Sequence, residues 1–132
     1  MVETIAAVAV GGAVGSVFRL WIGTAVQQRV GWAFPLGTLA INVSGSLLLG
    51  FLLRYGLATP SISPMARALL TTGFCGGYTT FSTFVYEAGV LIESGEYWGA
   101  GLYVVSSVAV GLAGLFVGLA AADGLIAVRE RL

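Results

Sequence analysis

Four long apolar stretches, separated by short polar segments, make up almost the whole of this 132-residue chain. A helix needs roughly 20 apolar residues to cross a bilayer, where its backbone groups must be satisfied internally. The stretches lie at about residues 5–26, 34–53, 65–92 and 97–122. The sequence therefore predicts an all-α membrane protein whose four transmembrane helices form a single domain, residues 1–132.

Charge is scarce in this chain. Only 9% of the residues are charged, against about 25% in a typical soluble domain, so water is not the solvent for most of the surface. The basic residues are scattered arginines, which argues against a nucleic-acid-binding stripe. Histidine and lysine are absent, no paired carboxylates form a catalytic motif, and the single cysteine matches no metal-ligand spacing. We therefore expect no enzyme activity and no nucleic-acid partner.

Four spans place both termini on one side of the membrane. Four arginines lie on the side of the termini: Arg54, Arg67, Arg129 and Arg131. Arg29 lies on the opposite side. The positive-inside rule then favours cytoplasmic termini, although so few charges give only a weak preference.

The third apolar stretch contains an unusual segment, GFCGGYTTFSTF, at residues 73–84. Glycine costs about 1 kcal/mol relative to alanine inside a helix, and β-branched threonine adds a smaller penalty. The glycines and threonines of this segment therefore predict a helix that is broken in mid-membrane. Within a membrane, unwound backbone is tolerated only where it is buried in protein or lines a water-filled cavity. Its carbonyl groups, freed from helical hydrogen bonds, are candidate ligands for a hard cation. The alternative is a kinked helix that serves packing alone.

Small and polar residues recur every four positions along the spans. Glycine pairs at this spacing, which let backbones approach closely, are Gly11 with Gly15, Gly73 with Gly77, and Gly114 with Gly118. Hydroxyl and amide side chains follow the same spacing at Thr38, Asn42 and Ser46 in the second stretch, and at Tyr103 and Ser107 in the fourth. Such polar tracks fit either an ion path or hydrogen bonding between helices, and spacing alone leaves both open.

Two phenylalanines and two ionisable residues complete the candidate site. Phe81 and Phe84 share a helix face, and their electropositive ring edges can meet an anion, although lipid-facing or core phenylalanines have the same spacing. Arg19 either attracts anions to a vestibule or extends to the membrane surface. Glu87 is a functional candidate because carboxylates are rare within spans, or it holds a hydroxyl group or Arg19.

Three of these segments resemble the Fluc, or CrcB-type, family of fluoride channels. They are GGAVGSVFR in the first span, GTLAINVSGS in the second and GFCGGYTTFSTF in the third. The fourth span contributes only Tyr103 and Ser107 to the resemblance.

The resemblance implies an antiparallel, dual-topology homodimer with two anion pores along its interface. It also implies a structural sodium ion where the two broken helices cross, held by the backbone carbonyls of Gly76 and Thr79. The expected pore residues are Thr38, Asn42, Thr80, Phe81, Ser82, Thr83, Phe84, Tyr103 and Ser107, with Arg19 in the vestibule and Glu87 as polar support. Dual topology expects almost no charge bias, so the arginine distribution is a departure from the family pattern.

The function implied is passive, fluoride-selective export of cytoplasmic fluoride across a prokaryotic cell membrane. The expected partners are a second, inverted copy of the chain, fluoride and the lipid bilayer. One alternative is a proton-coupled exporter of the small multidrug resistance type, which needs a membrane-embedded acid on the first span. Glu3 lies at the edge of that span and Glu87 lies on another. A non-conducting scaffold is a further alternative, but it leaves the polar tracks without a role.

Overall fold

The computed structural model describes residues 1–31 and 33–131, and these residues are almost entirely helical. The elements in chain order are α1 (Val2–Val30), α2 (Leu36–Leu57), α3 (Pro64–Ala68), the π-helix η1 (Leu69–Cys75), α4 (Gly76–Tyr78), α5 (Phe81–Glu93) and α6 (Tyr97–Glu130). No strand occurs within these ranges. The all-α prediction is therefore confirmed for the described part of the chain.

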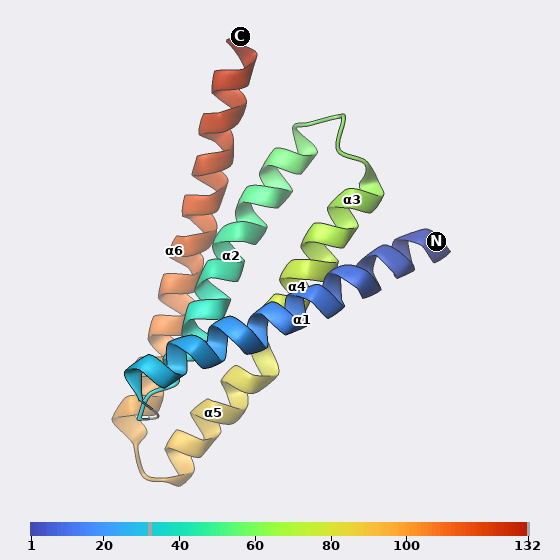
Figure 1. Cartoon of the computed structure of the whole chain (residues 1–132). Helices are drawn as coiled ribbons and strands as arrows, with labels where there is room; N and C mark the ends of the chain where they lie inside the picture. The colour runs from blue at the N-terminus through green and yellow to red at the C-terminus, as the bar shows by residue number, and fades with distance from the viewer. Residues whose placement is uncertain (32, 132) are drawn as a thin grey trace.

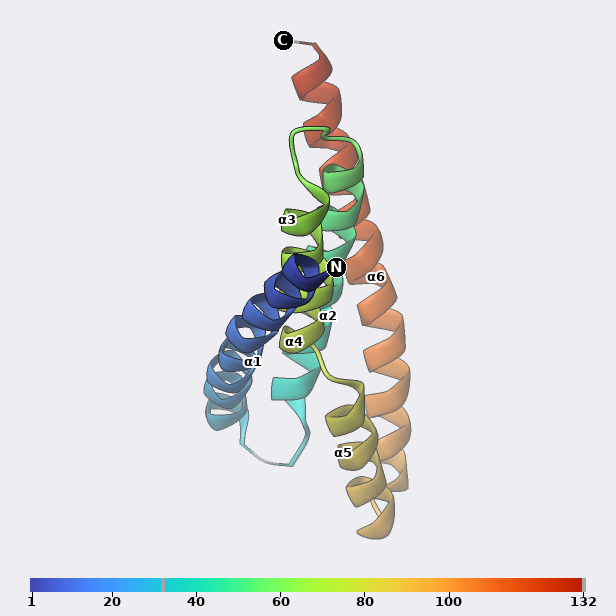
Figure 2. The ribbon, with the colours of Figure 1, turned by 90° about the vertical axis from the view of Figure 1, so that its right-hand side faces the viewer.

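The helices form an elongated bundle. α2 and α6 run side by side, while α1 crosses η1 and α4 obliquely (Figure 1). The C-terminal end of α6 and the connection at residues 58–63 lie toward one end, and the end of α1, the start of α2 and the connection at 94–96 lie toward the other (Figures 1 and 2). This alternation agrees with the four predicted spans.

Three helices are long and apolar enough to cross a membrane. They are α1, α2 and α6, with mean hydropathies of 1.8, 1.8 and 2.2. The remaining predicted span, the third at residues 65–92, corresponds to α3, η1, α4 and α5 together. α6 continues well past the predicted end at residue 122. Its 34 residues measure about 51 Å at 1.5 Å per residue, more than the hydrocarbon core of roughly 30 Å.

Polar contacts explain why α6 continues. Arg54 on α2 forms an ion pair of 3.3 Å with Asp123. Farther along, Arg129 donates to the Thr59 hydroxyl at 2.8 Å and to the Ala58 carbonyl at 3.0 Å. The last turns of α6 are thus attached to the end of α2 and to the loop that follows it.

The interruption predicted within residues 73–84 is present, and it falls on two threonines. Thr79 and Thr80 are extended, with φ and ψ of −90° and 165° and of −152° and 123°. The preceding glycines, which contributed most to the prediction, are all helical. Two of them, Gly73 and Gly77, instead permit close packing against α1, as the four-residue spacing predicted.

Glycines on both sides make this packing possible. A Cβ atom on Gly11 would collide with the Leu69 carbonyl oxygen, and one on Gly77 would collide with the backbone of Gly12. On the opposite side of the bundle, a Cβ atom on Gly118 of α6 would collide with a carbonyl oxygen of α2. By contrast, a Cβ atom on Gly76 would meet nothing within 4 Å, so this glycine faces an open side of the chain.

Candidate ion pathway

Asn42 on α2 holds the backbone of the helix break. Its Oδ1 accepts from the Thr80 N–H at 2.8 Å, and its Nδ2 donates to the Thr80 carbonyl at 2.9 Å. The Thr80 hydroxyl oxygen then accepts from the Thr83 N–H at 3.2 Å, which caps the first turn of α5. Hydroxyl oxygens are favourable N-caps because they satisfy helix N–H groups that lack an intrahelical partner.

The other side of the break is held from α1. Arg19 Nη1 donates to the Thr79 carbonyl oxygen at 3.3 Å, and Ser16 Oγ donates to the Gly77 carbonyl at 3.5 Å. Arg19 was one of the partners considered for Glu87, but in the described residues it contacts the backbone at the break instead. Ser16 was not singled out from the sequence. Its position one helical turn before Arg19 was the only available signal.

A first cavity, of about 610 Å³, lies between α2, η1, α5 and α6. Seven of the predicted site residues line it: Asn42, Gly76, Thr79, Thr80, Phe81, Phe84 and Ser107. The buried Ser107 Oγ has no hydrogen-bond partner among the described residues. Buried polar atoms are nearly always hydrogen-bonded, so this hydroxyl is a candidate donor beside the cavity.

Phe81 and Phe84 lie together at this cavity, as their spacing predicted. Their ring centroids are 5.8 Å apart and the ring planes differ by 46°. The two rings have different surroundings, since Phe84 packs against Tyr103 at 5.2 Å whereas Phe81 is 76% exposed.

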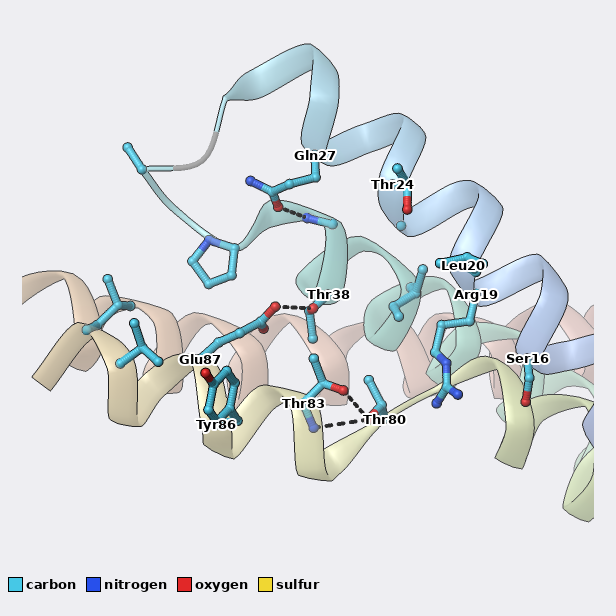
Figure 3. Close-up of a pocket in the computed structure, with 17 residues that line it drawn as sticks. Ser16, Arg19, Leu20, Thr24, Gln27, Thr38, Thr80, Thr83, Tyr86 and Glu87 are labelled. Carbon is cyan, nitrogen blue, oxygen red and sulfur yellow. Dashed lines mark hydrogen bonds between the residues drawn. The ribbon is translucent and has the colours of Figure 1, made fainter. Parts of the chain in front are cut away.

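A second cavity, of about 670 Å³, opens on the opposite side of the break (Figure 3). Arg19, Thr38, Thr83 and Glu87 line it, and Thr80 belongs to both cavities. Figure 3 shows that these side chains come from α1, α2 and α5. The second cavity therefore combines one basic and one acidic group with several hydroxyl groups.

Glu87 is bound by two hydroxyl groups from neighbouring helices. Oε1 accepts from Thr38 Oγ1 at 2.8 Å, and Oε2 accepts from the Tyr103 hydroxyl at 2.6 Å. Tyr103 is completely buried and lines neither cavity. Thr38 and Tyr103 therefore both form hydrogen bonds between helices, and Thr38 also lines the second cavity.

Ser82 also lies outside both cavities. Its side chain is exposed, and its Oγ is 3.4 Å from the Thr80 hydroxyl. The predicted site is thus divided into two cavities that meet at the helix break, with Ser82 and Tyr103 at their margins.

The backbone at the break fits the cation expected there. In a continuous α-helix the Thr80 N–H would bond to the Gly76 carbonyl, but here it donates to Asn42. The Gly76 carbonyl therefore loses its helical donor at an open position. The Thr79 carbonyl accepts from Arg19 and retains a second lone pair. No group of three or more acidic, histidine or cysteine side chains that could hold a metal ion occurs in the described residues.

Comparison with known proteins identifies the family. Residues 6–119 match the family model described as CrcB-like protein, Camphor Resistance (CrcB). A protein of Chlorobaculum tepidum named "Fluoride-specific ion channel FluC" is 49% identical over 118 residues, which cover 89% of this chain and 93% of that protein. The protein of the same name from Geobacter sulfurreducens is 49% identical over 122 residues, 92% of this chain and 98% of that one.

A third relative extends the same pattern. The fluoride-specific ion channel FluC of Roseiflexus sp. is 46% identical over 114 residues, which cover 86% of this chain and 92% of that protein. The match to the family model includes the helix break and most of all four apolar stretches. The chain belongs to the CrcB-like protein family.

Proposed function

We propose that this protein is a fluoride-selective channel that lets cytoplasmic fluoride leave the cell down its electrochemical gradient. The cavity of about 610 Å³ carries the proposal, because it brings together the Phe81 and Phe84 rings, Asn42 and the unpartnered Ser107 hydroxyl. A small, hard anion must exchange its hydration shell for donors that do not trap it. Hydroxyl and amide groups and ring edges are donors of that moderate kind. The three relatives named as fluoride channels support the same function.

The functional unit in this proposal is a homodimer of two inverted copies, with a pore along each side of the interface. The open side of the broken span supports it: Phe81 is 76% exposed and Gly76 has free space beside it. A second copy would cover these residues and close the cavity. The location proposed is the prokaryotic cell membrane, in line with the bacterial relatives and the three long apolar helices.

A sodium ion at the dimer centre is part of the proposal. The carbonyl oxygens of Gly76 and Thr79 from each copy would hold it. Its role would be structural: a positive charge where four carbonyl dipoles meet would join the two broken helices. Sodium is suited to this role because unwound backbone carbonyls coordinate it in other membrane proteins.

Fluoride efflux from liposomes tests the proposal directly. Purified protein is reconstituted into vesicles loaded with potassium fluoride, and valinomycin is added to carry the compensating potassium. Efflux measured with a fluoride electrode is expected to exceed that of protein-free vesicles. The same vesicles loaded with chloride should lose their anion much more slowly. Equal rates with and without protein would reject the channel.

The proton-coupled exporter remains the second candidate to exclude. It requires an acidic group within the first span, but Glu3 lies in the first turn of α1 and Glu87 lies on α5, bound to two hydroxyl groups. An exporter would move fluoride faster when a proton gradient is imposed. Efflux that is independent of the proton gradient is expected for the channel, and it would also exclude a non-conducting scaffold. The named channel relatives agree with the prediction that the chain is not an enzyme.

A further inference from the structure

One side chain, Asn42, satisfies both main-chain polar groups of the residue at which the third span is interrupted. An unsatisfied backbone group in lipid costs several kcal/mol, so an extended residue inside a span needs a partner of this kind. The amide is matched to the task because it offers an acceptor and a donor on one flat group. The Thr80 N–H requires the Oδ1 end and the Thr80 carbonyl requires the Nδ2 end, so both ends are assigned by their partners.

The Asn42 oxygen also determines whether the Gly76 carbonyl has a hydrogen-bond donor. In a continuous α-helix the acceptor for the Thr80 N–H is the Gly76 carbonyl, four residues earlier, so without Oδ1 this N–H has a helical partner available only if the break closes. By binding that N–H at 2.8 Å, Asn42 withdraws the donor from Gly76. The Gly76 carbonyl is left without a helical partner at a position where a Cβ atom would meet nothing within 4 Å.

We infer that Asn42 is a positioning residue that holds the helix break open and so keeps the Gly76 carbonyl available to a cation. The inference rests on the proposed function, since sodium is the cation proposed there. It differs from a role for Asn42 as a donor to the passing anion. An amide has two N–H bonds, and the Thr80 carbonyl takes one of them. Only one N–H remains for an anion, whereas the oxygen, as an acceptor, binds the backbone N–H and cannot donate to an anion.

The two roles depend on different atoms of the same side chain, so two substitutions separate them. Asn42→Asp keeps an acceptor oxygen for the Thr80 N–H but removes both amide donors. Asn42→Leu has a similar size and removes acceptor and donors together. Ser46→Ala is the matched control, because Ser46 lies one helical turn further along α2 and lines the same cavity. No side-chain hydrogen bond joins Ser46 to the break in the described residues.

The readout is the sodium dependence of stability, which does not require conduction. Thermal unfolding of each purified protein is followed in detergent without fluoride, with NaCl replaced stepwise by N-methylglucamine chloride at constant ionic strength. The wild-type unfolding temperature is expected to rise with sodium. Asn42→Leu should raise the sodium concentration that gives half of this effect at least tenfold. For Asn42→Asp and Ser46→Ala, the sodium concentration that gives half of the effect should be no more than threefold above the wild-type value.

Fluoride efflux is measured on the same preparations, so that the two proposals can fail separately. If Asn42→Leu keeps the wild-type sodium response, the positioning role is wrong, even if efflux is lost. If Asn42→Leu does not fold, Asn42→Asp still tests the inference. This variant keeps the acceptor oxygen, so a weakened sodium response in it would contradict the inference. A wild-type protein that conducts fluoride but shows no response to sodium also overturns it. A sodium response without fluoride efflux would reject the channel and leave the inference standing.

Discussion

The Tyr103 hydroxyl on α6 donates a hydrogen bond of 2.6 Å to Glu87 Oε2 on α5. The second carboxylate oxygen of Glu87 accepts from Thr38 on α2 at 2.8 Å. α5 packs chiefly against these same two helices, α6 and α2. One carboxylate therefore connects α5, which begins directly after the helix break, to both of its neighbours.

Replacing Tyr103 with phenylalanine should weaken this connection. The ring is completely buried and would keep its packing, so the change removes only the hydroxyl group. Hydrogen bonds between membrane helices contribute roughly 1 kcal/mol, so we expect a loss of about that size in the free energy of unfolding. Denaturation of the reconstituted or detergent-purified protein measures it. Tyr86→Phe is the control, because Tyr86 is 72% exposed and should tolerate the change.

A double-mutant cycle with Thr38→Val tests whether the two hydroxyl groups act through Glu87. If both bind the same carboxylate, the effects of the two substitutions should not be additive. Strict additivity, or a stability of Tyr103→Phe equal to that of Tyr86→Phe, would contradict the connection described above.

The residues that bind one another around Glu87 could be identified from the sequence, but their arrangement could not. Thr38, Tyr103 and Glu87 were all candidates because polar groups within spans are uncommon. Whether Glu87 would bind hydroxyl groups or Arg19 depended on how α1, α2 and α6 are placed around α5. Periodicity within a helix carries no information on that placement.

The helix break shows the same limit at shorter range. Helix propensity correctly indicated that residues 73–84 would not form one continuous helix. It gave too much weight to the glycines, which are all helical and of which Gly73 and Gly77 pack against α1, and it could not locate the two extended residues. Thr79 and Thr80 are extended because Arg19 and Asn42 supply hydrogen bonds from other helices. Propensity scales describe only the local chain and therefore omit such partners.

Alanine at Phe81 and at Phe84 should have different effects on stability. Phe84 packs against Tyr103, whereas Phe81 is 76% exposed in the single chain. Truncating a buried phenylalanine typically costs about 3–5 kcal/mol, so Phe84→Ala should lower the free energy of unfolding of the chain more than Phe81→Ala. Both substitutions should slow fluoride efflux in liposomes, because both rings line the proposed pore. Unchanged efflux in both variants would remove the rings from the mechanism.

The crossing of α1 with η1 should not tolerate a methyl group at Gly11. A Cβ atom there would collide with the backbone of Leu69, which cannot move as a flexible side chain can. Overpacking of this kind costs about 1–3 kcal/mol or more, so Gly11→Ala should lower the unfolding temperature and the yield of folded protein. Gly101→Ala on α6 is the control, since a Cβ atom there meets nothing within 4 Å. Equal stability of the two variants would show that α1 can shift to accommodate the methyl group.

Replacing Arg19 with glutamine removes the positive charge from the cavity of about 670 Å³. Because the glutamine side chain is shorter, the substitution also removes the hydrogen bond from Nη1 to the Thr79 carbonyl, and the dependence of efflux on salt distinguishes the two effects. A positive charge in a cleft raises the local concentration of anions, while Glu87 in the same cavity opposes this effect, so we expect fluoride efflux to fall by up to roughly tenfold at low ionic strength. The difference from wild type should shrink as salt is added, because the Debye length falls to about 10 Å at 0.1 M. Efflux is measured with a fluoride electrode across a series of salt concentrations.

Arg29→Gln provides the matched control on the same helix. Arg29 is exposed in the last turn of α1 and lines neither cavity. Fluoride efflux through the Arg29→Gln variant should therefore equal that of the wild type at every salt concentration. A loss in Arg19→Gln that is equal at low and high salt would mean that Arg19 acts by holding the Thr79 backbone and not by attracting anions. In that case Arg19→Gln should also disturb the backbone at the helix break, and sodium should raise the unfolding temperature of this variant less than that of the wild type. The salt series thus distinguishes a vestibule charge from a structural hydrogen bond made by the same side chain.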